Sequence, residues 1–307
     1  MSLQEKSQFI KQQALEIGFD ACGIAKAEYL SDDASHLQSW LNAGFHAGMH
    51  YMKNHFEKRT DPVKLIEGAK SIIVVLLNYY PKNYPFTGKP FKIARYALGE
   101  DYHFVIKKKL NFLFEKLNEK FGPVNGRAFT DSAPIMERAW AREAGLGWMG
   151  KNSLLLNKNL GSYFFIAELI IDCELEYDQQ KQIPNCGTCN RCIKACPTKA
   201  IVSPGIIDSN KCISYHAIES KDVIPDEIKL NQNGWVFGCD ICQEVCPWNG
   251  MSIPNNTDEF NPTASILSFS KEEIDAMNED EFSIQFKGSP LKRAGLKGLQ
   301  KNMKNLH

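Results

Sequence analysis

Residues 186–197 read Cys186-Gly-Thr-Cys189-Asn-Arg-Cys192-Ile-Lys-Ala-Cys196-Pro197, and residues 239–247 read Cys239-Asp-Ile-Cys242-Gln-Glu-Val-Cys246-Pro247. Three closely spaced thiolates followed by a cysteine before proline are the ligand pattern of paired 4Fe–4S clusters, in which that last cysteine binds the other cluster. The second run lacks its leading cysteine, because Val236 stands there. Cys212, between the runs, is the natural substitute. The pattern therefore predicts eight thiolate ligands for two clusters.

The spacing divides these ligands into two sets. One cluster is expected on Cys186, Cys189, Cys192 and Cys246, and the other on Cys196, Cys212, Cys239 and Cys242. A zinc ribbon would use four ligands rather than eight, and a disulfide framework is typical of small secreted domains. The two remaining cysteines, Cys22 and Cys173, stand in apolar surroundings and are interpreted as core residues. This cysteine pattern therefore predicts that the region transfers electrons one at a time.

Composition sets outer limits on the fold and on the partners. The chain has 307 residues, 43% of them hydrophobic, and a formal net charge of zero. One large domain with a smaller one is expected from this length. The longest apolar run, residues 72–77, is too short to span a membrane, and the polar N-terminus does not read as a targeting segment. Thiolate-bound clusters favour a reducing compartment, so a cytoplasmic location is expected. A net charge of zero creates no long-range electrostatic field that would attract nucleic acid, and the sequence leaves open the existence of a local basic patch.

Hydrophobic periodicity divides the chain into three parts. Helices are predicted over residues 3–18, about 33–43, 102–121 and 135–144, and strands over 21–25, 71–79, 127–130 and 162–172. The continuous β-branched run at 71–79 indicates a buried central strand. We therefore predict an α/β domain over residues 1–182, a two-cluster ferredoxin-like domain over 183–255, and a mostly polar, helical tail over 256–307.

The usual cofactor loops are missing from the first domain. It has neither a G-x-G-x-x-G after a strand nor a G-x-x-x-x-G-K-[ST] motif, and Gly145-Leu-Gly-Trp-Met-Gly-Lys-Asn-Ser matches neither spacing. Asp101-Tyr-His103 opens like the D-x-H-x-x-G of histidine-ligated cobalamin proteins, but Ile106 replaces the glycine. His103 is therefore interpreted as a helix-start or pocket residue rather than a metal ligand.

Four stretches together resemble one family. They are Arg95-Tyr-Ala-Leu-Gly-Glu-Asp-Tyr-His103, Asp131-Ser-Ala-Pro-Ile-Met-Glu-Arg138, Ala144-Gly-Leu-Gly-Trp-Met-Gly-Lys-Asn-Ser-Leu-Leu-Leu156, and the cysteine array running into Cys246-Pro-Trp-Asn249. Over roughly residues 5–300 the chain resembles epoxyqueuosine reductases, enzymes of queuosine-tRNA synthesis. It resembles the reductive dehalogenases more distantly.

The resemblance implies a fold and a reaction. The α/β N-terminal domain would bind cobalamin and be fused to the two-cluster ferredoxin-like domain, with a short helical basic C-terminal tail. The reaction would remove the epoxide oxygen of epoxyqueuosine as water, using two electrons that the clusters pass to cobalamin bound base-off, without a histidine beneath the cobalt. The implied partners are a queuosine-family tRNA, through its anticodon region, and a low-potential electron donor such as flavodoxin or ferredoxin. No membrane partner is implied, and a monomer is expected.

The resemblance also assigns residues. Asp131 would give a proton to the departing oxygen, whereas without the family it would read as a helix N-cap. Arg59 reads otherwise as an exposed loop charge, and residues 151–153 as a polar turn. The positions implied to contact the corrin are Arg59, Ala94, Arg95, Asp131, Lys151, Asn152, Ser153, Leu155, Ser214 and Asp240.

The last part of the chain is rich in basic residues. Residues 287–304 carry six basic side chains and no acidic one: Lys287, Lys292, Arg293, Lys297, Lys301 and Lys304. Such a run can be a solvated helix face, but on a tRNA-modifying enzyme it is expected to meet phosphates. Longer family members extend further, into a helical-repeat domain that contributes to tRNA binding. The alternatives left open are a dehalogenase-like corrinoid enzyme acting on a small molecule and a non-catalytic ferredoxin-type electron carrier.

Overall fold

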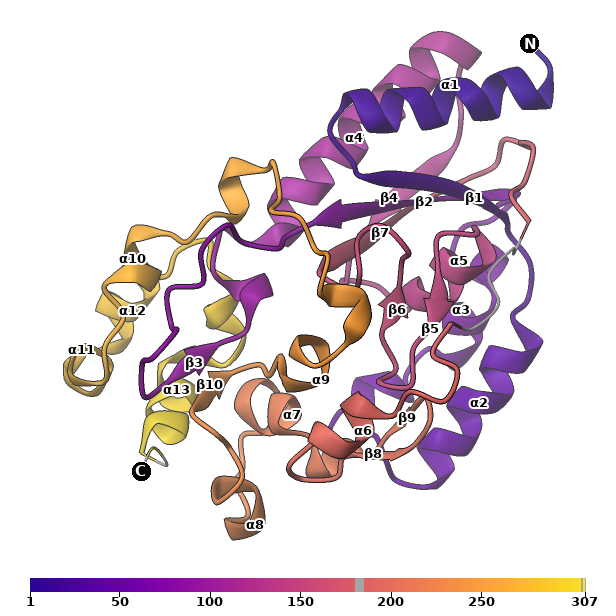
Figure 1. The fold of residues 1–307 in the computed structure, drawn as a ribbon. Coiled ribbons are helices and arrows are strands. Elements are labelled where there is room, and N and C mark those ends of the chain that lie inside the picture. The colour runs from indigo at the N-terminus through magenta and orange to yellow at the C-terminus, as the bar shows by residue number, and fades with distance from the viewer. Residues whose placement is uncertain (180–184, 305, 307) are drawn as a thin grey trace.

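A four-stranded antiparallel sheet organises the first part of the chain (Figure 1). The computed structural model describes residues 1–179, 185–304 and 306. The strands run in the order β1 (Ala21–Lys26), β2 (Ser71–Asn78), β7 (Phe164–Ile171) and β4 (Gly126–Phe129). Every residue of β2 is buried, which confirms the predicted central strand. Because helices cover both faces of the sheet, its central strands read as continuous apolar runs although they pair antiparallel.

Two helices cover one face of the sheet. Helix α1 (Leu3–Glu16) begins with a capping box between Ser2 and Glu5, and α4 (Tyr102–Phe121) begins at the cap Asp101. Their apolar stripes pack on alternate residues of β2 and β7 in one hydrophobic cluster. In Figure 1 both helices lie on the same side of the sheet, at the top of the view. The predicted helices 3–18 and 102–121 are therefore confirmed to within two residues.

The opposite face carries α5 (Glu137–Glu143) and shorter elements. A second hydrophobic cluster joins α5 to the other alternate residues of β2 and β7. The remaining elements of this part are α2 (Ser31–Asn42), α3 (Phe56–Thr60), and the two-stranded pair β5 (Trp148–Met149) and β6 (Leu155–Leu156). The predicted helix 135–144 begins later than expected, because residues 131–136 form a loop that includes Pro134.

The cysteine-rich part is built from short elements beneath the sheet in Figure 1. In chain order they are α6 (Arg191–Ala195), β8 (Ile201–Ser203), β9 (Ile206–Ile207), α7 (Ile213–Ile218), α8 (Asp226–Lys229), β10 (Trp235–Phe237) and α9 (Ile241–Glu244). Strand β10 pairs parallel with β3 (Lys92–Ile93), which comes from the first part of the chain. Segments far apart in sequence therefore share one small sheet.

Four helices complete the chain: α10 (Ala264–Leu267), α11 (Lys271–Ala276), α12 (Glu279–Gln285) and α13 (Gly295–Met303). Their apolar residues form one cluster with Phe86, Phe91 and Ile93 of the first part and Val236 and Phe237 of β10. The C-terminal segment is thus helical, as expected, but it packs as part of a common core. The boundaries at 182 and 255 stay predictions. No helix in the described ranges is long and apolar enough to cross a membrane.

Candidate functional site

The seven cysteines of the two runs and Cys212 between them lie in two sets. All eight side chains are half-buried. Burial and then the nearby thiols of Cys246 and Cys186 raise the pKa of Cys192. In the other set, burial and then Cys212 and Cys242 raise the pKa of Cys239. These neighbours fall within the ligand sets that the spacing predicts.

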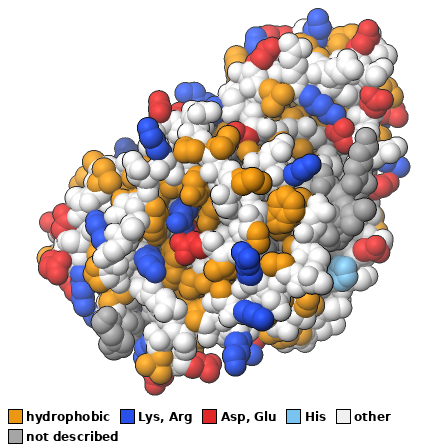
Figure 2. Space-filling model, in the orientation of Figure 1, with side chains coloured by type: hydrophobic (Ala, Val, Ile, Leu, Met, Phe, Trp, Pro, Cys, Tyr) orange, Lys and Arg blue, Asp and Glu red, His pale blue; other side chains and the backbone are white. Residues whose placement is uncertain are grey.

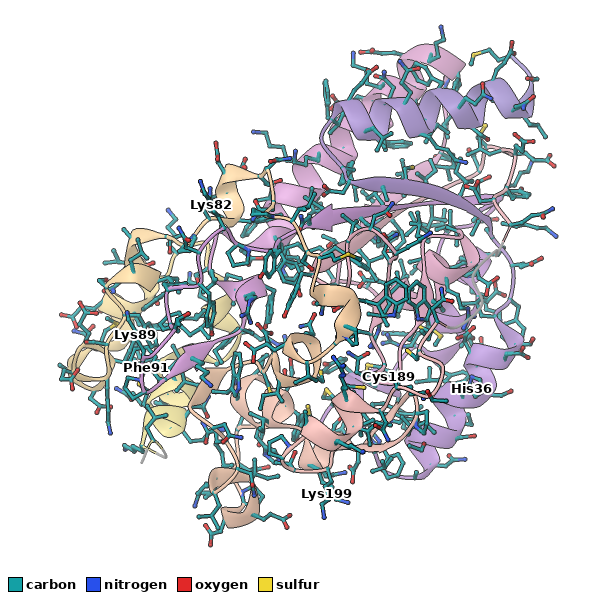
Figure 3. The ribbon with its side chains drawn as sticks, in the orientation of Figure 1. His36, Lys82, Lys89, Phe91, Cys189 and Lys199 are labelled. Carbon is teal, nitrogen blue, oxygen red and sulfur yellow. The ribbon has the colours of Figure 1, made fainter. Side chains whose placement is uncertain are left out.

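Contacts within and between the sets complete the picture. Cys246 interacts with Cys186 and Cys189, and Cys212 interacts with Cys196. Burial, and then charges that include Cys212 and Cys196 of its own set and Cys192 of the other set, raise the pKa of Cys242. Helices α6 and α9, which carry cysteines of the two runs, pack against each other. Figure 3 labels Cys189 beside α6. The two sets are therefore adjacent, as electron transfer between two clusters requires.

Backbone amides point at several of the sulfurs. The amide of Ala200 donates to Cys196 Sγ at 3.2 Å, and the amides of Ser214 and Tyr215 face Cys212. Hydrogen bonds of this kind favour the thiolate form and tune cluster potentials. Within the described ranges no three His, Cys, Asp or Glu side chains converge closely enough to hold a single metal ion. A cluster in which each thiolate binds a different iron needs a wider spacing than one ion does.

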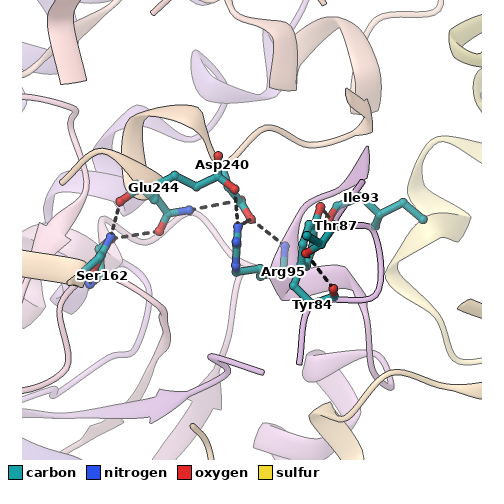
Figure 4. A network of polar contacts seen from close by, with 9 residues as sticks. Tyr84, Thr87, Ile93, Arg95, Ser162, Asp240 and Glu244 are labelled. Carbon is teal, nitrogen blue, oxygen red and sulfur yellow. Dashed lines mark hydrogen bonds and ion pairs between the residues drawn. The ribbon is translucent and has the colours of Figure 1, made fainter. Parts of the chain in front are cut away.

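Arg95 and Asp240, both predicted site residues, form the centre of a polar network (Figure 4). Arg95 Nη1 lies 3.0 Å from Asp240 Oδ2 and 2.8 Å from Glu244 Oε1, and the Arg95 amide donates to the same Asp240 oxygen. Asp240 is 2% exposed, and burial raises its pKa to about 6 against the opposing charge of Arg95. The guanidinium also lies 4.3 Å from the centre of the Tyr84 ring. This network fixes the start of α9, beside Cys239, to the loop after β3.

Asp131 lies on the loop that follows β4, next to the start of α4. Its carboxyl Oδ2 accepts a 2.5 Å hydrogen bond from the Tyr102 hydroxyl and lies 4.0 Å from His103 Nε2. Its backbone has a φ of +45°, in the left-handed region, and its amide donates to Glu137 Oε1 at 2.5 Å. Since α5 begins at Glu137 with Met136 at its N-cap position, Asp131 is not a helix cap. The Asp131 side chain is 63% exposed.

Tyr102 and His103 belong to this acidic site, although the sequence did not identify them as partners of Asp131. Asp101 caps α4 and contacts His103 Nδ1 at 2.6 Å. Burial lowers the pKa of His103, but the hydrogen bond and charge of Asp101 outweigh it, so the pKa is raised. Burial and the adjacent Asp131 raise the pKa of Tyr102. The helix predicted over residues 102–121 places both residues on its first turn, but only the fold brings that turn to Asp131.

The loop at 151–153 contacts the cysteine-rich part directly. Lys151 Nζ donates to the carbonyl oxygens of Gly187 and Cys189 at 2.6 and 2.9 Å, and Ser153 Oγ donates to Gly205 O at 2.5 Å. Of these predicted corrin contacts, Lys151 therefore holds the first cysteine run, and Ser153 holds the turn between β8 and β9. Asn152 between them is 2% exposed, and its Nδ2 has no hydrogen-bond partner in the described part of the chain.

The other predicted contacts lie at separate points around these features. Arg59 is 9% exposed; its Nη2 donates to Tyr51 O at 3.1 Å, while its Nε is buried and meets no acceptor among the described residues. Ala94 is buried and its amide donates to Phe237 O, and Leu155 is buried in β6. Figure 2 shows hydrophobic side chains gathered across the middle of the face that it presents.

The basic run is only partly available to a partner. Arg293 pairs with Glu219 at 2.8 Å, and Lys301 Nζ donates to Ser220 O at 2.7 Å. Lys287, Lys292, Lys297 and Lys304 are exposed, and Arg293 keeps 59% of its side chain exposed beside Glu219. A pocket of about 340 Å³ is lined by Val223, Ile224, Lys229, Lys297, Gln300, Lys301 and Lys304.

Known proteins share both halves of this arrangement. Residues 185–249, which contain all eight cysteines, match a 4Fe–4S double cluster binding domain, so this region holds two iron–sulfur clusters. Residues 59–132, which end one residue after Asp131, match the family described as epoxyqueuosine reductase QueG, DUF1730. The two matched regions together contain the cysteine sets, Arg95 and Asp131.

Three similar proteins extend these matches over the whole chain. An epoxyqueuosine reductase of Cyclobacterium marinum is 52% identical over 303 residues, which cover 98% of this chain and 97% of that protein. A structure of epoxyqueuosine reductase with an epoxyqueuosine-modified tRNA-Tyr stem loop matches with a TM-score of 0.89 at 28% identity, covering 99% of this chain and 81% of that one. The Bacillus subtilis enzyme, with its catalytic aspartate loop swung out of the active site, matches with a TM-score of 0.92 at 28% identity over 99% and 82% of the two chains. By these matches in sequence and fold, the chain belongs to the epoxyqueuosine reductase family.

Proposed function

We propose that this chain reduces epoxyqueuosine in tRNA to queuosine, with the cysteine-rich part supplying electrons and the Asp131 site supplying a proton. The observation that carries this proposal is the coexistence, in one molecule, of two adjacent thiol sets and an exposed carboxyl group held by Tyr102. The relatives reported above are all named epoxyqueuosine reductases, which favours this reading over a small-molecule dehalogenase or an electron carrier.

The cluster ligands follow the predicted sets. Cys186, Cys189, Cys192 and Cys246 would hold one cluster, and Cys196, Cys212, Cys239 and Cys242 the other. The mutual proximity of the thiols within each set supports this division. The electrostatic effect of Cys192 on Cys242, and the packing of α6 on α9, support a short path from one cluster to the next.

Cobalamin fits the polar groups that the protein leaves without partners. Arg59 Nε and Asn152 Nδ2 are buried donors with no acceptor, and the corrin offers carboxamide oxygens and a phosphate. Ala94, Arg95, Lys151, Ser153, Leu155, Ser214 and Asp240 are proposed to surround it. When bound base-off, cobalamin would supply the reducing chemistry at carbon. Since His103 is held by Asp101 and lies beside Asp131, it is proposed as part of the acid site and not as a cobalt ligand.

Asp131 is proposed as the group that delivers a proton to the departing oxygen. Its exposed carboxyl can reach a substrate, while the hydrogen bond from Tyr102 orients it. His103, whose pKa is raised, would favour the approach of an electron-rich oxygen by its positive charge. Closure of a substrate over this loop would remove water and make proton donation at neutral pH easier.

The remaining partners are proposed from the chemistry of the exposed side chains and from the family. The exposed Lys292, Lys297 and Lys304 are proposed to meet tRNA phosphates. A low-potential donor such as flavodoxin or ferredoxin would supply electrons, and a monomer in the cytoplasm is proposed.

Binding of cobalamin to the anaerobically reconstituted protein tests the cofactor assignment. Clusters alone should give broad visible absorption, and added cobalamin should remain bound through gel filtration and contribute its own bands. His103→Gln should bind cobalamin as well as the wild type does. Failure of the wild type to retain cobalamin, or its loss in His103→Gln alone, would overturn this part of the proposal. Turnover of a halogenated phenol without any action on tRNA would support the dehalogenase alternative.

A further inference from the structure

A carboxylic acid lies in the apolar core behind the Asp131 site. Glu168, in the middle of β7, is 0% exposed, and both of its carboxyl oxygens lack a hydrogen-bond partner among the residues that the structure describes. Its strand neighbours are Val74 on β2 and Phe129 on β4. Ile166 and Ile170, two residues away on either side, belong to the cluster that packs under α5. Because side chains alternate along a strand, Glu168 points into the layer between the sheet and α5.

Such a group is stable there only when it carries its proton. Transfer of a carboxylate into an apolar layer is costly, whereas a neutral carboxyl costs far less. Burial, and then the charges of Glu137 and Asp131, place the pKa of Glu168 well above its usual range. Packing alone does not explain an acid at this position, since a leucine or methionine would fill the layer without any polar atom. Burial of Glu168 with both carboxyl oxygens unpartnered among the described residues therefore favours its protonated form.

The charge of a second carboxyl group, Glu137, acts on Glu168, and the same group is bonded to the backbone of Asp131. Glu137 opens α5, and its Oε1 accepts the backbone amide of Asp131 at 2.5 Å. Burial, and then the charge of Asp131, raise the pKa of Glu137 to about 8. Thr130, between β4 and Asp131, has a buried hydroxyl without a partner. The groups thus run from the closed core to an exposed carboxyl.

The reaction requires more protons than Asp131 holds. Removing an epoxide oxygen as water while forming an alkene consumes two electrons and two protons, and one carboxyl group carries only one. We propose that Glu168 and Glu137 form a buried proton reserve that recharges Asp131 and so supplies the second proton. This inference rests on the proposed function. The electrons come from the external low-potential donor through the clusters.

The proton balance closes within these groups. Asp131 gives its proton to the oxygen as the C–O bond breaks, and becomes a carboxylate. The Glu137 carboxyl then passes its proton to Asp131, and the proton of Glu168 is shared with Glu137. Asp131 gives the second proton to complete water. One proton from solvent, taken up through exposed Asp131, restores each proton used.

Other charged groups face the same loop. Tyr102 and His103 contact Asp131 from α4, with Asp101 behind His103. Arg138, beside Glu137 on α5, donates to Ser153 O. His103 is the competing source of a second proton. Its side chain is 36% exposed, so solvent reaches it directly, whereas Glu168 is 0% exposed and would release its proton only after Asp131 has given up its own.

Infrared spectroscopy of the resting protein tests the reserve without any substrate. The wild type should show the carbonyl band of a protonated carboxyl between about pH 6 and pH 8, and Glu168→Gln should remove one component of it. Glu137→Gln should remove a component that titrates near pH 8. The exposed Glu174→Gln is the matched control and should leave the band unchanged. Absence of any protonated carboxyl in the wild type, or a band unaltered in Glu168→Gln, would overturn the proposal.

The pH dependence of turnover tests its use. Glu168→Gln keeps the size and neutrality of the protonated acid, so clusters and cobalamin content should match the wild type. Its rate of epoxyqueuosine reduction should fall roughly tenfold near pH 8 and by less than about twofold near pH 6, where solvent supplies protons faster. Glu137→Gln should show the same pH-dependent loss of rate. This second variant tests the proposal if Glu168→Gln does not fold. Rates equal to the wild type at both pH values, or a pH-dependent loss confined to His103→Gln, would contradict the reserve. If the wild type itself reduced no epoxyqueuosine, the proposed function would fail, while the infrared result would still decide whether the reserve exists.

Discussion

Asp131 adopts a backbone conformation that few residues accept. Its φ of +45° lies in the left-handed region, which costs a residue with a side chain roughly 1–3 kcal/mol unless the surroundings compensate. The hydrogen bonds to Tyr102 and Glu137 hold it there. Strain of this kind concentrates at functional sites, which agrees with a role for this carboxyl in the chemistry.

Replacing Asp131 by Asn separates chemistry from conformation. Asn accepts the left-handed region as readily as Asp and can still accept the Tyr102 hydrogen bond, so the free energy of unfolding should change little. Because an amide cannot donate a carboxylic proton, turnover should fall by about 10²–10⁴. Iron content, bound cobalamin and tRNA nucleosides are measured together, with Asp32→Asn on α2 as the control. A folded Asp131→Asn variant that converts the epoxide at nearly the normal rate would remove Asp131 from the mechanism.

Cys212 stands alone between the two cysteine runs, so its substitution tests the division into ligand sets. Cys212→Ser should lose or destabilise one cluster, with about four of eight iron atoms remaining. Cys22→Ser, in the sheet domain, is the control and should keep all of them. Iron content near eight per chain and an unchanged electron paramagnetic resonance signal after reduction of Cys212→Ser would disprove the assignment.

At the scale of elements, the loop after β5 holds the first cysteine run in place. Lys151 donates to Gly187 O and Cys189 O, both within the Cys186–Cys192 run. Its ammonium group carries the charge, and hydrogen bonds to charged groups contribute roughly 1.5–3 kcal/mol each when buried, less at a surface. The loop therefore links the sheet domain to one cluster.

Lys151→Met keeps the length of the side chain and removes both hydrogen bonds. We expect the first cluster to be lost several times faster to an iron chelator, at a rate read from the visible absorption, because its loop is free to open. Lys194→Met, at the exposed end of α6, is the matched control. Equal rates of cluster loss in the two variants would mean that the two hydrogen bonds do not stabilise the cluster.

Elements with strong periodicity were predictable from the sequence, and contacts between distant elements were not. The apolar run of β2 and the helical spacing of α4 fixed those elements to within two residues. The start of α5 was misplaced, because Asp131 turns into the left-handed region and Pro134 follows it. Nothing local in the sequence indicates that Arg95 meets Asp240, 145 residues away, or that Tyr102 meets Asp131.

At the scale of the whole molecule, the C-terminal helices serve as both core and surface. One side of α13 is buried with Leu296, Leu299 and Met303, while Lys297 and Lys304 are exposed. Arg293 and Lys301 are engaged within the protein. The basic run found in the sequence is therefore a smaller surface than its six charges suggest.

Replacing Lys297 and Lys304 by Ala should weaken tRNA binding and leave the clusters intact. Each phosphate contact removed should lower the slope of log affinity against log salt concentration by roughly 0.7–0.9. The control is the double variant Lys70→Ala with Lys120→Ala, two exposed lysines on other elements. Filter binding at several salt concentrations measures the slope, and an unchanged slope and affinity would show that these lysines form only a solvated face.

The central claim is that this chain converts epoxyqueuosine to queuosine within tRNA. The most direct test incubates the anaerobically reconstituted wild type with cobalamin, a low-potential reductant and tRNA bearing epoxyqueuosine, and reads the nucleosides by mass spectrometry. The account predicts loss of one oxygen mass from the modified nucleoside, dependent on the clusters, cobalamin and reductant together. Persistence of epoxyqueuosine in the presence of intact clusters and bound cobalamin would contradict it.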